Sequence, residues 1–404
     1  MEVLYERCSG LDVHKRTVVA CVRTAAGQQT RTFGTTTEAL LALGDWLVAQ
    51  GVTHVAMEST GVYWQPVYNL LESLDLQVLV VNAQHVKAVP GRKTDVKDAE
   101  WLADLLRHGL IRGSAIPDRP RRELRELVRY RVGLVRQRAQ VIHRIHKLLE
   151  GANIKLASVV TDITGVTGRA ILDALANGRT DPLEMANLAR GSLRTKREQL
   201  ATTLRGSFGA HQRLVLASQL RHLDFLTAEL DRLNTEVAER LRPHEGVIER
   251  LDAIPGVGRR VAEQVLAEVG PDVARFPTAA HLASWAGLCP GNHESAGKRL
   301  SGRTRKGNGW LRAALVEAAW GAAHTRQSYL AAQYRHLAAR RGNKRALIAV
   351  AHSLVVIIYH LLREGTIYQD LGPNYYDERH RDATVRRSVR RLERLGYRVT
   401  VEVA

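Results

Sequence analysis

Short apolar runs and stretches of helical spacing alternate in the first part of the chain. Apolar or alternating runs predict strands at Ser9–Val13, Val18–Val22, Gln28–Phe33, Thr53–Met57 and Leu76–Val81. Apolar residues at helical spacing predict helices at Thr37–Ala49, Val67–Leu74 and Asp95–His108. Strands that first follow one another and then alternate with helices indicate an α/β domain, which we assign to residues 1–118.

The remainder of the chain has helical spacing. The pattern predicts a long amphipathic helix over Arg119–Glu150 and further helices over Leu183–Leu241. Leucines of the second stretch recur at threes and fours, which suits a coiled coil, a dimerisation arm or an ordinary helix pair within one chain. We predict a basic helix and coiled-coil region at 119–247, a mostly helical domain at 248–365 and a basic tail at 366–404.

The net charge of the chain indicates the kind of partner that the protein binds. The 404 residues include 59 Lys and Arg against 41 Asp and Glu, a formal net charge of +18. This surplus favours a polyanion, with nucleic acid ahead of an anionic membrane surface, and a basic protein that is merely soluble is the alternative. Charged and histidine residues interrupt the most apolar segment, Arg345–Leu362, so we expect a buried core helix and no membrane span.

The cysteines and the N-terminus indicate an intracellular protein. Cys8, Cys21 and Cys289 show no CxxC spacing, which argues against a disulfide scaffold or a zinc finger. The first residues, MEVLYERCSG, lack the basic start and apolar stretch of a signal peptide. We therefore expect reduced thiols in the cytoplasm.

Four acidic residues stand at positions that can converge. Asp12 ends the first predicted strand and Glu58 the fourth, while Asp95 and Asp98 are three apart on one helix face. Singly, such residues are more often caps or surface charges. Together, clustered carboxylates repel one another unless a cation binds them, and hard oxygen ligands suit Mg²⁺ or Mn²⁺. The pattern predicts a metal site for phosphodiester chemistry.

The long helix predicts a nucleic-acid interface. Arginines crowd its polar positions and few acidic residues balance them, which favours phosphate binding over a plain solvated face. The arginines that we assign to this interface are Arg121, Arg122, Arg125, Arg129 and Arg136.

A glycine turn predicts a second phosphate contact. The sequence Ile254-Pro-Gly-Val-Gly before a helix resembles a helix-hairpin-helix element, in which backbone N–H groups, here at Gly256 and Gly258, contact phosphates. A plain connection between two helices is the alternative.

The segment Gly291–Gly307 interleaves small and basic residues. A serine such as Ser295 attacks phosphate only if a base or metal activates it and cations steady the phosphate. An ordinary phosphate-binding loop is the alternative, and chemistry alone does not single out this serine. The basic residues assigned to the loop are Lys298, Arg299, Arg303, Arg305 and Lys306.

The motifs carry a family resemblance when taken in order. The strings LDVHK, MESTG, KTDVKDAEWLADLL, IPGVG and NHESAGKRLSGRTRKGN resemble the DEDD-type insertion-sequence transposases, relatives of the Piv invertase that include recombinases guided by a bridge RNA. The resemblance covers about residues 9–365. It implies a RuvC-like RNase H domain, a coiled-coil insertion and a C-terminal transposase domain. The family's acidic tetrad maps onto Asp12, Glu58, Asp95 and Asp98.

The resemblance also implies a serine nucleophile. That role maps onto Ser295, which follows Glu294 where many relatives have a second serine; Ser301 is the weaker alternative. The family implies a site composed from two subunits, dimers that pair into tetramers on DNA, and a structured guide RNA.

We therefore predict a DNA recombinase that cuts and rejoins DNA in the bacterial cytoplasm, at the nucleoid when active. It would use a Mg-binding acidic tetrad and a serine nucleophile. The first alternative is a metal-dependent nuclease or junction resolvase, which needs the four acids but not Ser295. The second is a nucleic-acid-binding protein without catalysis, which leaves four convergent carboxylates unexplained because carboxylates repel phosphate.

Overall fold

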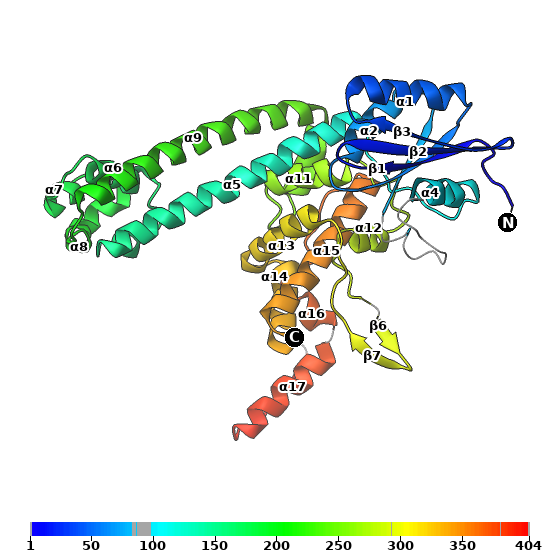
Figure 1. Cartoon of the computed structure of the whole chain (residues 1–404). Coiled ribbons are helices and arrows are strands. Elements are labelled where there is room, and N and C mark those ends of the chain that lie inside the picture. The colour runs from blue at the N-terminus through cyan, green and yellow to red at the C-terminus, as the bar shows by residue number, and fades with distance from the viewer. Residues whose placement is uncertain (1, 83–85, 87–97, 292, 380, 403–404) are drawn as a thin grey trace. The chain divides into compact units, whose positions relative to one another are not determined.

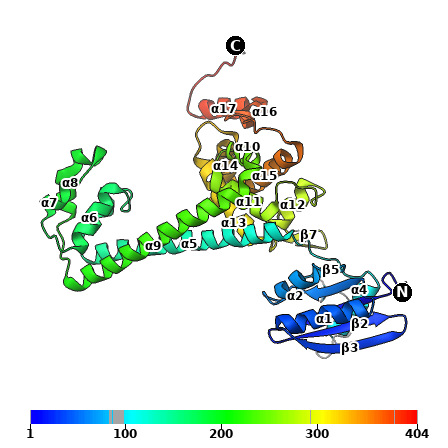
Figure 2. The same cartoon turned by 90° about the horizontal axis from the view of Figure 1, so that it is seen from above.

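The computed structural model describes residues 2–82, 86, 98–291, 293–379 and 381–402. The chain divides into two compact units, Met1–Asp118 and Arg119–Ala404, and each is described by itself (Figures 1 and 2). The division coincides with the end of the first predicted domain, while the boundaries at residues 247 and 365 stay predictions.

The first unit is built on a mixed five-stranded sheet in the order β3-β2-β1-β4-β5. Strands β1, β2 and β3 form an antiparallel meander, and β4 and β5 continue the sheet parallel to β1. This confirms the predicted α/β, RNase H-like arrangement of sheet and helices. The strand bounds are Cys8–Val13 for β1, Thr17–Thr24 for β2, Gly27–Gly34 for β3, His54–Glu58 for β4 and Gln77–Val81 for β5.

Helices cover the two faces of this sheet. Alternation along β1 sends Leu11 and Val13 into a core with α1 (Thr37–Ala49) and α2 (Trp64–Leu71). Cys8 points to the opposite face, where it joins a second cluster with α4 (Asp98–Arg107). The central strands β1 and β4 are therefore covered on both sides, while the edge strand β3 is mostly exposed.

Two long helices dominate the start of the second unit. Helices α5 (Arg119–Gly151) and α9 (Ala210–Leu241) run antiparallel, side by side, and share a leucine-rich core (Figures 1 and 2). The leucines predicted to form a coiled coil thus pack in a helix pair within one chain.

Short helices cover the far end of this pair. They are η2 (Leu156–Ser158), α6 (Val166–Ala176), α7 (Pro182–Ala186), η3 (Gly191–Lys196) and α8 (Arg197–Thr203). The helices predicted within Leu183–Leu241 are thus α7, η3, α8 and α9, and the chain turns before Gly209 to bring the leucines of α9 back onto α5.

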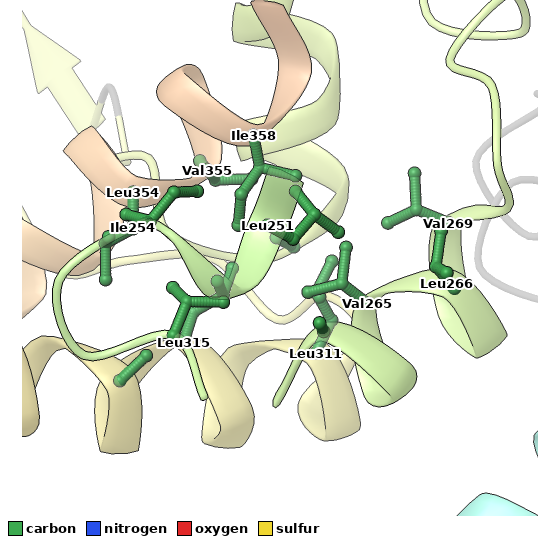
Figure 3. Close-up of a cluster of buried hydrophobic side chains, with 14 of the residues drawn as sticks. Leu251, Ile254, Val265, Leu266, Val269, Leu311, Leu315, Leu354, Val355 and Ile358 are labelled. Carbon is green, nitrogen blue, oxygen red and sulfur yellow. The ribbon is translucent and has the colours of Figure 1, made fainter. Parts of the chain in front are cut away.

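A bundle of helices forms the rest of the second unit around one apolar core, to which Leu251, Leu315 and Ile358 contribute (Figure 3). Its elements are η4 (Arg242–His244), α10 (Glu245–Asp252), α11 (Arg259–Val269), α12 (Ala279–Trp285), α13 (Gly309–His324), α14 (Tyr329–Arg341) and α15 (Asn343–Glu364). After it come α16 (Tyr375–Arg379) and the exposed α17 (Arg381–Arg394). By length and composition α15 could cross a membrane, but half of its most apolar stretch is buried in the core of this unit, as a core helix requires.

A buried carboxylate joins α5 to the bundle. Glu268 of α11 is 2% exposed and accepts hydrogen bonds from Arg129 Nε at 2.7 Å and from Asn308 Nδ2 at 2.7 Å. Arg125 Nε lies 3.3 Å from the same carboxylate. Burial lowers the pKa of Arg125 to about 10, so the guanidinium stays charged at neutral pH. One acid thus satisfies two arginines of α5 and the N-cap of α13.

We expect Glu268→Gln to lower the free energy of unfolding by about 3–5 kcal/mol, because it leaves the guanidinium groups of Arg125 and Arg129 without their buried counter-charge. Denaturant titration followed by circular dichroism measures this. The control Glu229→Gln removes a more exposed ion pair with Arg232, at 2.9 Å, and should cost less than about 1 kcal/mol. Equal effects of the two changes would contradict the role given to Glu268.

Candidate active site and nucleic-acid interface

Two of the predicted acids lie on neighbouring parallel strands. Gly10 pairs with Ala56 and Leu11 with Met57, so Asp12 and Glu58 are the next pair in register. Residues two apart on a strand share a face, which places both acids on the α4 side, with Gly10 and Ala56. Both are half-buried.

The N-terminus of α4 directs a third acid toward the same edge of the sheet. A Cβ on Gly10 would lie 2.2 Å from the Ala99 carbonyl oxygen and 2.4 Å from the Ala103 nitrogen, so the helix backbone lies directly on β1. Cys8 contacts Ala103, and Ala99 contacts Gly10, so α4 runs antiparallel to β1. The N-terminus of α4, where Asp98 stands, therefore lies toward Asp12.

The donor chemistry of this edge fits a hard divalent cation. Asp12 and Glu58, near the carboxyl ends of β1 and β4, and Asp98, at the start of α4, offer carboxylate oxygens. Asp95 lies outside the described residues. Within the described ranges, no group of three or more His, Cys, Asp or Glu side chains is close enough to hold a metal ion. The metal-ligand assignment stays a prediction.

His14 is a neighbour of the acids that the sequence did not single out. Its Nε2 lies 3.0 Å from Asp12 Oδ2, in an exposed pair. The LDVHK string places the two side chains two residues apart, but only the turn after β1 brings the imidazole back onto the carboxylate.

Ser295 occupies the end of a hairpin in the second unit. Strands β6 (His293–Ser295) and β7 (Lys298–Ser301) pair antiparallel, with Ser295 opposite Lys298. Ala296 and Gly297, at φ +48° and +73°, form the two-residue turn with the positive φ angles that a tight hairpin requires. Ser295 and Lys298 are both exposed, and the hairpin projects away from the helices of its unit (Figure 1).

Ser301, the alternative serine, has a local role. Its Oγ accepts a hydrogen bond from the Arg303 backbone N–H at 3.2 Å. The loop cations follow the hairpin: Arg299 lies in β7, and Arg303, Arg305 and Lys306 are exposed beyond it.

Three of the arginines predicted to form a basic face on α5 have partners within the chain, and their contact with phosphate stays a prediction. Arg125 and Arg129 pair with Glu268, as described above. Arg125 also donates to the Glu268 carbonyl oxygen at 2.8 Å, and Arg121 to that of Val269 at 3.4 Å. The last carbonyls of a helix carry partial negative charge, so these arginines stabilise the C-terminus of α11. The acid that balances them lies far along the chain, where a local count of charges could not find it.

The other two arginines assigned to α5 differ from these. Arg136 is exposed, with its guanidinium 5.4 Å from the centre of the Trp310 ring, and Arg122 is half-buried. Contact with phosphate stays a prediction for both.

The glycine turn forms between α10 and α11, and its two glycines have different environments. Gly256 has φ +84°, and a Cβ there would lie 2.1 Å from the Ala318 carbonyl oxygen of α13. Its lack of a side chain thus allows close helix packing, a reason that the turn motif did not reveal. Gly258, the N-cap of α11, is exposed, and a Cβ on it would meet no described atom within 4 Å.

Comparison with known proteins decides the family. A model of the DEDD transposase domain of the IS110 type matches residues 9–154, and a model described as "Transposase IS116/IS110/IS902 family" matches residues 248–335. The chain belongs to the IS110/IS116/IS902 family of transposases. The transposase therefore catalyses DNA strand transfer, has DNA as a partner, and is of a DEDD type that implies a divalent metal ion.

Relatives of this transposase cover most of its length. The IS117 mini-circle protein of Streptomyces coelicolor is 30% identical over 62% of this chain and 68% of its own. A 43.6 kDa protein of insertion element IS110 from the same species is 29% identical over 70% of this chain and 74% of its own. The transposase for insertion sequence element IS1111A of Coxiella burnetii is 24% identical over 78% of this chain and 79% of its own.

We expect Gly10→Ala to reduce transposition by about 10²-fold, because the new Cβ displaces α4 and with it Asp98 from the edge of the sheet. Transposition frequency of the element in cells measures this, with circular dichroism to confirm folding. The control Gly133→Ala adds a Cβ in α5 that meets no described atom within 4 Å and should leave the frequency unchanged. Full activity of Gly10→Ala would refute the placement of α4.

Proposed function

We propose that this transposase joins itself covalently to DNA through Ser295 while it exchanges strands. The observation that carries the proposal is the position of Ser295, exposed beside a two-residue turn and opposite Lys298, in a chain of a strand-transfer family. A hydroxyl at such a turn can approach a large substrate without obstruction by its own chain. Ser301 is a poorer candidate, because its oxygen accepts a backbone hydrogen bond.

The chemical step balances without a further reactant. Ser295 Oγ forms a bond to the phosphorus of one phosphodiester as the bond from that phosphorus to a sugar oxygen breaks. The serine proton leaves Oγ, and the released sugar oxygen gains a proton to become a hydroxyl. The phosphoserine keeps the phosphodiester energy, so a second sugar hydroxyl can reverse the step and join a new strand.

The acids have a supporting part in this scheme. Asp12, Glu58 and Asp98, with Asp95, would bind a divalent ion, Mg²⁺ by preference, that lowers the charge of the reacting phosphate and promotes loss of the serine proton. The exposed Lys298 lies opposite Ser295 in the hairpin, and its ammonium group would stabilise a phosphate oxygen. Without a bound cation, the carboxylates of the four acids would repel the DNA backbone.

Assembly and guidance belong to the same proposal. The acids lie in the first unit and Ser295 in the second, which is compatible with a site composed from two copies of the chain, as dimers that pair into tetramers on DNA. The +18 charge is compatible with a structured guide RNA that pairs with DNA while the protein contacts backbone. We place this activity in the cytoplasm, at nucleoid DNA.

We expect Ser295→Ala to reduce covalent attachment to DNA by about 10³-fold or more, because the variant lacks the attacking oxygen. The measurement uses cells that carry the full-length chain and its element: DNA is recovered under denaturing conditions and the attached residue is identified by mass spectrometry. Ser301→Ala is the matched control and should keep the adduct. Asp12→Asn should lose both cutting and adduct.

Two outcomes would overturn the proposal. If DNA were attached to a residue other than Ser295, that residue would be the nucleophile. Cutting by Ser295→Ala at the normal rate, without any adduct in the parent, would favour the metal-dependent nuclease.

A further inference from the structure

A groove in the second unit has an uncompensated positive rim. It lies between the segment after β7 and the first half of α15, with a volume of about 1240 Å³. Four cations line it, Arg303, Arg341, Lys344 and Arg345, all exposed. Of the described residues that line the groove, none is acidic. Its volume exceeds that of a usual small-molecule pocket, which indicates an extended ligand.

The position of these cations indicates an anionic ligand. Lys344 and Arg345 lie in the first turn of α15, and this turn contains no acidic residue. Cations are unfavourable at a helix N-terminus, because the backbone there already carries partial positive charge. The arginines of α5 differ, since Glu268 balances Arg125 and Arg129 within the chain. A bound polyanion would relieve the repulsion at α15.

The floor of the groove adds a different chemistry. Leu300 of β7 is 60% exposed, and Ile348 and His352 of α15 are half-buried beside it. Burial lowers the pKa of His352, so its flat ring is neutral at neutral pH. Apolar side chains and a flat ring beside a basic rim match a single nucleic-acid strand, whose unpaired bases stack while its phosphates meet cations. A duplex hides its base faces and would use only the rim.

We propose that this groove binds a single strand of DNA, with phosphates on the rim of Arg303, Arg341, Lys344 and Arg345 and a base on Leu300, Ile348 and His352. Leu300 and Ser295 belong to the same hairpin, so the bound strand continues from the groove toward Ser295. That the strand is the one under attack rests on the proposed function of Ser295; the binding itself does not. DNA is favoured over RNA because strand transfer by this family acts on DNA.

The test measures binding of the full-length chain, in EDTA, to fluorescent dT20, to a 20-base-pair duplex and to rU20. The triple variant Arg341→Gln, Lys344→Gln, Arg345→Gln should weaken dT20 binding at least tenfold. It should also reduce the slope of log affinity against log salt by about 2, at about 0.7 per single-strand phosphate contact. Leu300→Ser with His352→Ala should weaken dT20 by about 5- to 100-fold with the slope unchanged.

The matched control removes the same charge elsewhere. Arg232→Gln, Arg240→Gln, Arg242→Gln neutralises three arginines of α9 and η4 that pair with nearby glutamates, and should leave the dT20 slope unchanged. Equal weakening of dT20 and duplex by the groove variants would overturn the single-strand assignment, and a larger effect on rU20 than on dT20 would overturn the choice of DNA.

The two proposals fail separately. Ser295→Ala should bind dT20 with the affinity of the parent chain, whatever the nucleophile is. Normal dT20 binding by the groove variants would overturn the proposal that the groove binds DNA. It would not affect the proposal that Ser295 forms the covalent adduct.

Discussion

The buried carboxylate of Glu268 constrains the second unit of this transposase. It is 2% exposed, and removal from water is costly for an ion unless partners replace the lost hydration. Arg129, Arg125 and Asn308 are those partners, from α5 and from the N-cap of α13. The start of the 33-residue α5 is therefore held against the bundle that carries the hairpin of Ser295.

A second buried acid also pairs with arginines inside the second unit. Glu263 is fully buried and accepts hydrogen bonds from Arg131 of α5 and from Arg259 and Arg260 of its own helix. Arginines that face these acids stabilise the fold. The cations of the groove at α15 face no acidic lining residue among those described, and Lys298 is exposed on the hairpin. A net charge of +18 thus includes both arginines that stabilise the fold and exposed cations in a groove without an acidic lining residue among those described, which a total cannot separate.

In the first unit, the constraint is a close approach of backbones. With only hydrogen on Gly10, α4 lies on β1, and its N-terminus carries Asp98 toward the strand ends where Asp12 and Glu58 are neighbours. Carboxylates so placed repel one another and repel DNA, which is why a divalent ion belongs to this chemistry. The acids and Ser295 belong to separate units of the chain.

The sequence by itself determined the elements of the first unit and the family. Strands and helices over residues 8–81 follow local periodicity, and the motif order carried the resemblance that the comparisons confirm. Tertiary structure alone decided what the arginines of α5 contact, why Gly256 lacks a side chain, and that Leu300 and Lys344 share a groove. Arg129 and Glu268 are 139 residues apart, and periodicity describes only neighbours along the chain, so no local pattern reveals partners that folding brings together.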